Sequence, residues 1–182
     1  KEMNGIMWKS SKPVKMDVDD SSAINTKTLV LASGNETEFY DSESDTWQKA
    51  SICQMGNDWR GIKGGEWIWV RDTVTKEEAI TGTKKKLRLK FNLPSESADS
   101  IRTAEMLLRS EDACHISVND VRLVQEYGGA EYPDPFLIDI DQYVQVGDNT
   151  ITFELVSYAK PDAKVPEDNL VGLIYRLHVE YS

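Results

Sequence analysis

The chain has 182 residues, of which 40% are hydrophobic and 29% are charged, and this composition suits a globular protein with a sizeable core. Its 31 acidic and 21 basic residues give a formal net charge of −10, so partners rich in phosphate would be repelled. No apolar stretch approaches the length of a membrane span. We therefore expect neither nucleic-acid binding nor a membrane-spanning segment.

The first part of the chain is polar and weakly patterned. We expect a polar arm at residues 1–28 and one domain at residues 29–182, because no long linker or internal repeat interrupts the latter. A short strand is expected at 28–33, followed by an acidic, turn-rich segment at 34–47. Helical periodicity is nearly absent, although 72–80 could hold a short helical turn.

From residue 67 onward, apolar residues alternate with polar ones, as they do in half-buried β-strands. This alternation recurs in "EWIWV" (66–70), "KKLRLKFNLP" (85–94), "TAEMLLRSE" (103–111), "PFLIDIDQYV" (135–144), "NTITFELVSY" (149–158) and "LIYRLHVEY" (173–181). "CHISVNDVRLV" (114–124) predicts a hairpin, with Asn119 and Asp120 in a two-residue turn that requires positive φ. The sequence therefore predicts an all-β fold, an antiparallel β-sandwich with at most short helical turns.

Lys84, Lys85 and Lys86 form the one basic run of the chain, which continues with Arg88 and Lys90. Because apolar residues alternate with the later charges, we expect a solvated strand face rather than a binding patch.

Several pieces follow one another in an order that carries a resemblance. They are "DTWQKAS" (45–51), "EWIW" (66–69), "LKFNLP" (89–94), "AEMLLRSED" (104–112), "ISVNDVRLV" (116–124), "YVQVGDNTITFEL" (143–155) and "GLIYRLHV" (172–179). This order resembles the galactose-binding-like β-sandwich, a jelly roll found beside glycoside hydrolases and in bacterial surface proteins. The resemblance implies a ligand site in the loops at one edge of the sandwich and an extracellular or surface-exposed protein. Asp120 stands where such modules usually have a glycine.

Trp67 and Trp69 flank Ile68, and alternation puts both tryptophans on one face of their strand. They could form a ligand platform, a membrane anchor or part of the core. The resemblance implies a structural strand, so we expect both rings in the core or under a loop.

Catalytic signatures are absent from the sequence. The two histidines, His115 and His178, lie in expected strands without a nucleophile or metal motif. Carboxylate pairs suited to a glycosidase are abundant only because acidic residues are abundant. We therefore expect a protein that is not an enzyme.

Cys53 and Cys114 allow either one disulfide or two buried free thiols, and their spacing does not suit zinc.

Calcium is the expected cofactor, if there is one. "DVDDSS" (17–22) clusters Asp17, Asp19 and Asp20, whose oxygens could meet one cation in a curled loop, and Asp139 and Asp141 alternate similarly. The alternative is solvated acids in turns. The resemblance supports a structural calcium without selecting its ligands.

Sugar binding requires an aromatic face and planar polar side chains, and two loop segments combine them. The candidate ligand-binding residues are Asn57, Asp58, Trp59 and Arg60 in "NDWRG" (57–61), and Tyr127, Glu131, Tyr132 and Asp134 in "EYGGAEYPDP" (126–135).

The favoured function is a non-catalytic module that binds a glycan or another cell-surface ligand. The alternative is a self-assembling subunit of a surface filament, surface layer or virion. Such a subunit would exchange strands through the N-terminal arm and could bind calcium between copies.

Overall fold

The structure is a computed structural model that describes residues 25–53, 60–94, 100–129, 132 and 134–182. Its elements are nearly all strands. They are β1 (Lys27–Ala32), β2 (Glu38–Asp41), β3 (Thr46–Lys49), β4 (Ser51–Ile52), β5 (Ile68–Trp69), α1 (Lys76–Thr81), β6 (Thr83–Leu93), β7 (Ile101–Ser110), β8 (Ala113–Val118), β9 (Val121–Gly128), β10 (Phe136–Asp139), β11 (Gly147–Ser157), the 3-10 turn η2 (Pro166–Asp168) and β12 (Leu173–Tyr181).

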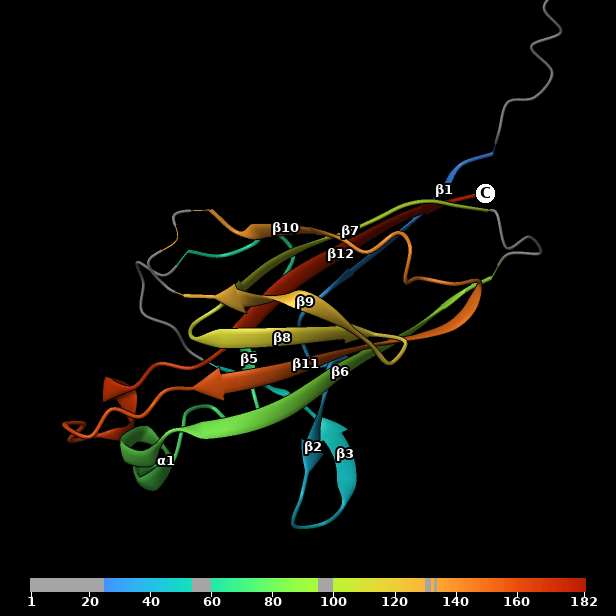
Figure 1. Cartoon of the computed structure of the whole chain (residues 1–182). Coiled ribbons are helices and arrows are strands. Elements are labelled where there is room, and N and C mark those ends of the chain that lie inside the picture. The colour runs from blue at the N-terminus through green and yellow to red at the C-terminus, as the bar shows by residue number, and fades with distance from the viewer. Residues whose placement is uncertain (1–24, 54–59, 95–99, 130–131, 133) are drawn as a thin grey trace, which may run out of the picture.

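The strands form two antiparallel sheets (Figure 1). The first sheet has the order β10-β7-β12-β5-β4, with β1 also paired to β12, and the second has the order β3-β2-β6-β11-β8-β9. The expected all-β antiparallel sandwich is therefore confirmed. No helix in the described ranges is both long and apolar enough to span a membrane.

The core lies between the two sheets, and strand alternation builds it. Ile151, Phe153 and Leu155 of β11 are buried, and the alternate residues of β12 are buried opposite them. Phe153 of the second sheet stacks on Tyr175 of the first, with ring centroids 4.8 Å apart. The Tyr175 hydroxyl in turn bonds the Thr37 hydroxyl at 2.7 Å, which satisfies a buried polar group.

Trp67 and Trp69, just before and in β5, both pack in this core. Trp67 is 8% exposed and Trp69 is 1% exposed, so the expectation of core packing is confirmed. Ile68 and Val70 are buried as well, because the chain here is covered on both sides. The strand itself is short, since only Ile68 and Trp69 pair in the sheet.

The predicted hairpin is present, with Val118 opposite Val121. Asn119 and Asp120 have φ values of 49° and 66°, as a two-residue turn of this kind requires. The short helix expected near 72–80 is also present as α1, which begins after Thr75 in a capping box with Glu78.

The segment 34–47 differs from the expectation of a simple turn-rich stretch, because most of it forms the β2–β3 hairpin. Tyr40 and Trp47 lie opposite each other on its two strands, with ring centroids 5.5 Å apart. The Asp41 carboxylate accepts bonds from the Glu43 amide and the Ser44 hydroxyl and so closes the turn. The strand expected at 28–33 is present as β1, which begins one residue earlier, at Lys27.

The two cysteines are free thiols, and both are buried. Cys53 follows β4 of the first sheet, whereas Cys114 lies in β8 of the second. The alternative of a disulfide between them is therefore wrong.

Candidate functional site

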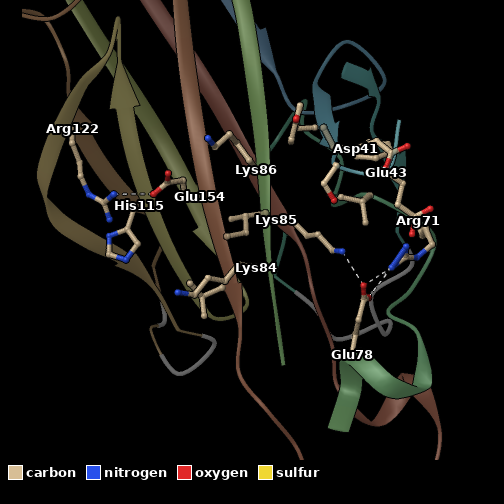
Figure 2. A pocket seen from close by; sticks show the side chains of 16 residues that line it. Asp41, Glu43, Arg71, Glu78, Lys84, Lys85, Lys86, His115, Arg122 and Glu154 are labelled. Carbon is tan, nitrogen blue, oxygen red and sulfur yellow. Dashed lines mark hydrogen bonds and ion pairs between the residues drawn. The ribbon is translucent and has the colours of Figure 1, made fainter. Parts of the chain in front are cut away.

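An open hollow of about 780 Å³ lies along β6, and we call it the β6 hollow (Figure 2). Its walls come from β2 and the turn after it, from residues 70–71, from α1, and from β6, β8, β9 and β11. Small-molecule sites in proteins commonly have volumes of about 300–1,000 Å³. The hollow is therefore large enough for a ligand of a few sugar-sized rings.

The hollow exists because β2 follows β6 for only two residues. Glu38 pairs with Arg88 and Phe39 pairs with Leu87, and β2 then diverges from β6. Among the described residues, the part of β6 from Thr83 to Lys86 has no strand on that side, although β11 pairs with it on the other. The diverging hairpin and the end of β6 thus enclose an open space.

Glu78 of α1 anchors one end of this space. Its carboxylate closes the helix cap by accepting from the Thr75 amide at 3.3 Å. The same carboxylate accepts from Arg71 at 2.7 Å and from Lys85 at 2.8 Å. Burial alone would raise the pKa of Glu78, but the bonds from Arg71 and Lys85 hold it below its ordinary value. The ionised side chain of Glu78 therefore both caps the start of α1 and holds Arg71 and Lys85 in the wall of the hollow.

Four side chains follow one another across the outer face of the second sheet. Lys86 lies opposite Glu154 of β11, and Glu154 lies opposite His115 of β8. Tyr40 takes the next place on β2, because its neighbour Phe39 pairs with Leu87. Residues that face each other in adjacent antiparallel strands share one side of the sheet. Tyr40, Lys86, Glu154 and His115 all line the hollow.

The acidic and basic groups of this face are unequally paired. Arg122 of β9 binds Glu154 at 2.8 Å, as the dashed line in Figure 2 marks. His115 lies 3.0 Å from Glu126. Within the described ranges, Lys84 and Lys86 form no ion pair, and both are exposed. Lys84 and Lys86 are thus exposed to solvent, as expected of an outward strand face, whereas Lys85 points to the other side and binds Glu78.

The β2–β3 turn supplies the opposite wall. Tyr40 is half-buried, and its hydroxyl donates to Asp45, which raises the pKa of Tyr40. Asp41 accepts from the Ser44 hydroxyl at 2.7 Å and from the Glu43 amide at 3.1 Å, and these bonds lower the pKa of Asp41. The wall therefore offers an aromatic ring beside a firmly ionised carboxylate.

The loop residues expected to bind ligand meet elsewhere, around Arg109 of β7. Arg109 donates to the carbonyl of Tyr132 at 3.1 Å. Burial lowers the pKa of Arg109, the nearby charge of Arg60 lowers it further, and Asp134 acts in the opposite direction. Arg60, Tyr132 and Asp134 are thus brought together with Arg109, and we call these four residues the loop-edge cluster.

The remaining loop candidates have other placements. Tyr127 is 9% exposed, and its ring lies edge-on to Phe136 with the ring centroids 5.5 Å apart. Tyr132 is 48% exposed, and its ring centroid lies 5.2 Å from that of Phe136. Tyr127 is therefore packed against Phe136 beneath the loop-edge cluster, and its ring is too buried to stack on a ligand. The other four candidates, Asn57, Asp58, Trp59 and Glu131, lie outside the described residues.

The calcium candidates Asp17, Asp19 and Asp20 also lie outside the described residues. Asp139 and Asp141 accept backbone bonds, Asp139 from the amide of Asp141 at 3.0 Å and Asp141 from the amide of Ala104. In the described part of the chain, no three His, Cys, Asp or Glu side chains gather as a metal site.

Sequence reasoning missed the residues that line the β6 hollow. Tyr40 lies in the segment 34–47, where the many turn-forming residues do not indicate a strand. Glu154 and His115 lie in amphipathic strands, and nothing in their local sequence marks them as site residues. The sequence shows the basic run, and strand alternation then places Lys85 on one face of β6 and Lys84 and Lys86 on the other. The available signal was this alternation, combined with the strand register.

No family model matches the chain, and no curated protein matches it. Among solved structures, the fold is similar to part of a putative β-galactosidase from Bacteroides fragilis, with a TM-score of 0.52, 13% identity, and coverage of 84% of this chain and 23% of that chain. An FMN-binding β-glucuronidase from Faecalibacterium prausnitzii L2-6 gives a TM-score of 0.46 at 14% identity, with coverage of 84% of this chain and 22% of that chain. The chain thus spans less than a quarter of either enzyme. The likeness concerns the fold, and the galactose-binding-like assignment stays a prediction.

Proposed function

We propose that this chain is a carbohydrate-binding β-sandwich module and that the β6 hollow is its saccharide site. The observation that carries the proposal is the hollow itself, about 780 Å³ in volume and lined by both aromatic and planar polar side chains. The sequence predicts a ligand site at the loop edge, whereas the structure supports the β6 hollow as the site for the same function.

The chemistry of the lining suits a sugar. A pyranose presents apolar C–H faces that pack on aromatic rings, and Tyr40 supplies such a ring at one wall. Sugar hydroxyls both donate and accept, so they are matched by fixed carboxylates and guanidinium groups. Asp41 is a fixed acceptor, and Arg71 is a fixed donor because Glu78 holds it through both carboxylate oxygens at 2.7 Å.

The likeness to part of a putative β-galactosidase supports a carbohydrate-related role, since the matched portion is a fraction of an enzyme whose name refers to a sugar. The match covers 23% of that chain, so it supports a domain-level role rather than the activity of the whole enzyme.

We propose further that binding occurs without catalysis. A glycosidase needs a carboxylic acid whose pKa is raised, so that it can protonate the leaving group. In the hollow, hydrogen bonds lower the pKa of Asp41, and the bonds from Arg71 and Lys85 lower that of Glu78. These two carboxylates are therefore suited to accept hydrogen bonds and not to donate a proton.

The test is a glycan array followed by titration of each hit against the ¹⁵N-labelled protein. We expect amide shifts along β6, β11 and the β2–β3 turn, and a loss of binding of at least about fivefold in Tyr40→Ala, since an aromatic contact contributes about 1 kcal/mol or more. Tyr158→Ala is the matched control, because Tyr158 is 56% exposed and does not line the hollow.

A third variant separates the two candidate sites. Tyr132→Ala removes the exposed ring of the loop-edge cluster and leaves the hollow intact. Binding that is lost in Tyr132→Ala and retained in Tyr40→Ala would refute the hollow and restore the loop edge. Product analysis of each incubated hit addresses catalysis, and a released sugar would contradict the non-catalytic proposal.

One observation favours a second candidate, the self-assembling subunit. Val124 on the edge strand β9 is fully exposed, and Leu137 on the edge strand β10 is 65% exposed. Exposed apolar side chains on edge strands are places where another chain can add a strand. Light scattering over a concentration series, with calcium and with chelator, tests this candidate. Growth into large species would support it, and a 20.6 kDa monomer throughout would exclude it.

A further inference from the structure

The β6 hollow has the opposite charge balance from the chain as a whole. The lining carries five lysines and arginines against four acidic residues, whereas the whole chain carries 21 against 31. A locally positive hollow in a protein of net charge −10 is therefore a distinct feature of this face.

The positive charge that no ion pair compensates lies on one side of the hollow. Arg122 is compensated by Glu154, and Arg71 and Lys85 share Glu78. Lys84 and Lys86 are left as ammonium groups without an ion-pair partner in the described part of the chain. Both project from the outer face of β6, and Figure 2 shows them on the same side of the strand as Arg122, His115 and Glu154.

The negative charge lies at the opposite wall. Asp41 ends β2 and Glu43 lies in the β2–β3 turn, and Figure 2 shows both across β6 from Lys84 and Lys86. Asp41 is held ionised by its bonds from Ser44 and Glu43. Apart from the groups in ion pairs, the hollow therefore has free ammonium groups on one side of β6 and the carboxylates of Asp41 and Glu43 on the other.

We propose that the β6 hollow selects a saccharide that carries a single negative charge, as a carboxylate or a sulfate ester, and that Lys84 and Lys86 are the specificity residues. The inference rests on the proposed function, since it takes the same hollow as the saccharide site. The anionic group of the sugar lies at the lysines, its ring packs beside Tyr40, and its hydroxyls donate to Asp41 and Glu43.

The carboxylate wall limits the charge of the ligand. A neutral sugar can accept hydrogen bonds from the ammonium groups through its hydroxyls, but it gains no ion pair with them. A phosphorylated sugar carries close to two negative charges at neutral pH, and Asp41, Glu43 and Glu154 repel the second. A ligand with a single negative charge can pair with the lysines and meets the least repulsion from the carboxylates.

The experiment varies one substituent of the sugar. Methyl galactoside, methyl galacturonide, methyl galactoside 6-sulfate and methyl galactoside 6-phosphate differ only at C6, and the corresponding glucosides form a second series. Each is titrated into the ¹⁵N-labelled full chain at low salt. We expect the carboxylate or the sulfate, or both, to bind about five- to tenfold more tightly than the neutral and phosphorylated sugars, with shifts at Lys84, Lys86 and Glu154. This advantage should shrink at about 0.5 M salt, because exposed charges are screened.

The variants test the role of the lysines. In the double variant Lys84→Met, Lys86→Met, affinity for the preferred anionic sugar should fall about tenfold, since each exposed charge pair contributes a factor of about two to five. Affinity for the neutral sugar should stay within about twofold. Lys90→Met is the matched control, because Lys90 is an exposed lysine on the same face of β6 but outside the hollow. The double variant Lys84→Arg, Lys86→Arg should keep the preference.

The outcomes separate this inference from the proposed function. Equal affinity for neutral and anionic sugars, with shifts in the hollow, would overturn the charge selection and leave the saccharide site standing. Tightest binding by the phosphorylated sugar would overturn the single-charge limit. An anionic preference that survives in the Lys→Met double variant, or whose shifts appear only at Tyr132 and Asp134, would overturn the assignment to the lysines. No shift from either series would overturn both proposals.

Discussion

Asn149 should be among the most costly polar residues to replace. It lies in β11 beside the β10–β11 connection and is only 2% exposed. Its amide nitrogen donates to the carbonyls of Gln145 at 2.7 Å and Gly147 at 3.0 Å. Its oxygen accepts from the Gln145 amide at 2.9 Å and from the Asn119 side chain at 2.8 Å. One side chain thus joins the connection before β11 to the turn of the β8–β9 hairpin.

The cost of Asn149→Ala follows from these four bonds. Each intramolecular hydrogen bond contributes about 1 kcal/mol net, and a buried group left without a partner costs about 1–3 kcal/mol. Water can reach the connection because Gln145 is exposed, so part of the loss is recovered. We therefore expect a loss of about 3 kcal/mol in the free energy of unfolding, which corresponds to a Tm lower by about 6–12 °C in a domain of this size.

Urea unfolding followed by tryptophan fluorescence and circular dichroism measures this loss. Asn92→Ala is the matched control, because Asn92 is exposed and its side-chain bond to Asp148, at 2.9 Å, lies on the surface. It should cost less than about 0.5 kcal/mol. Asn149→Asp should be milder at about pH 4 than at pH 7, since the carbonyls that face the new carboxyl raise its pKa and favour its protonated form. A cost below about 1 kcal/mol for Asn149→Ala would refute the reasoning.

Two further predictions concern the backbone and the thiols. Gly128→Ala should lower the free energy of unfolding by more than about 3 kcal/mol in a thermal melt, because Gly128 has φ +136° and a Cβ there would lie 1.7 Å from the carbonyl oxygen of Asp112. Gly34→Ala is its control, since nothing lies within 4 Å of the added carbon. Burial raises the pKa of Cys53 to about 12 and also raises that of Cys114, so neither thiol should react with a thiol reagent at about pH 8 unless urea is added. Because unfolded thiols ionise near their ordinary pKa of 9.0, stability should fall as pH rises from there toward about 12, and a flat urea midpoint over this range would contradict the assignment.

The strands were predictable from sequence because each has one face to bury. Leu87, Leu89 and Leu93 of β6 are all buried, and alternation alone indicates this. The turn at Asn119 was predictable for a different reason, since few residues other than glycine accept positive φ at low cost. Both are local properties that a single segment contains.

The hollow was not predictable, because it depends on which strands become neighbours. Tyr40 reaches Lys86 only through the pairing of Phe39 with Leu87, nearly fifty positions away in the chain. The β2–β3 hairpin was obscured by the turn-forming residues between its two short strands. Its stability comes instead from contacts with a distant residue, because Arg88 lies 4.0 Å over the Trp47 ring and binds Glu38 at 3.0 Å.

The same strands that build the core also carry the proposed site, and this explains how recognition could vary without loss of the fold. On β6 and β11, Leu87 and Leu155 point inward, while Lys86 and Glu154 point outward. Outward side chains that make few core contacts can change with little effect on stability. Glu78 is the exception, because it closes the helix cap and also positions Arg71 and Lys85 at the hollow. If this face is the ligand site that we propose, a change in its specificity is expected to arise at Lys84, Lys86 or the β2–β3 turn, whereas Glu78 is constrained by the fold as well as by the site.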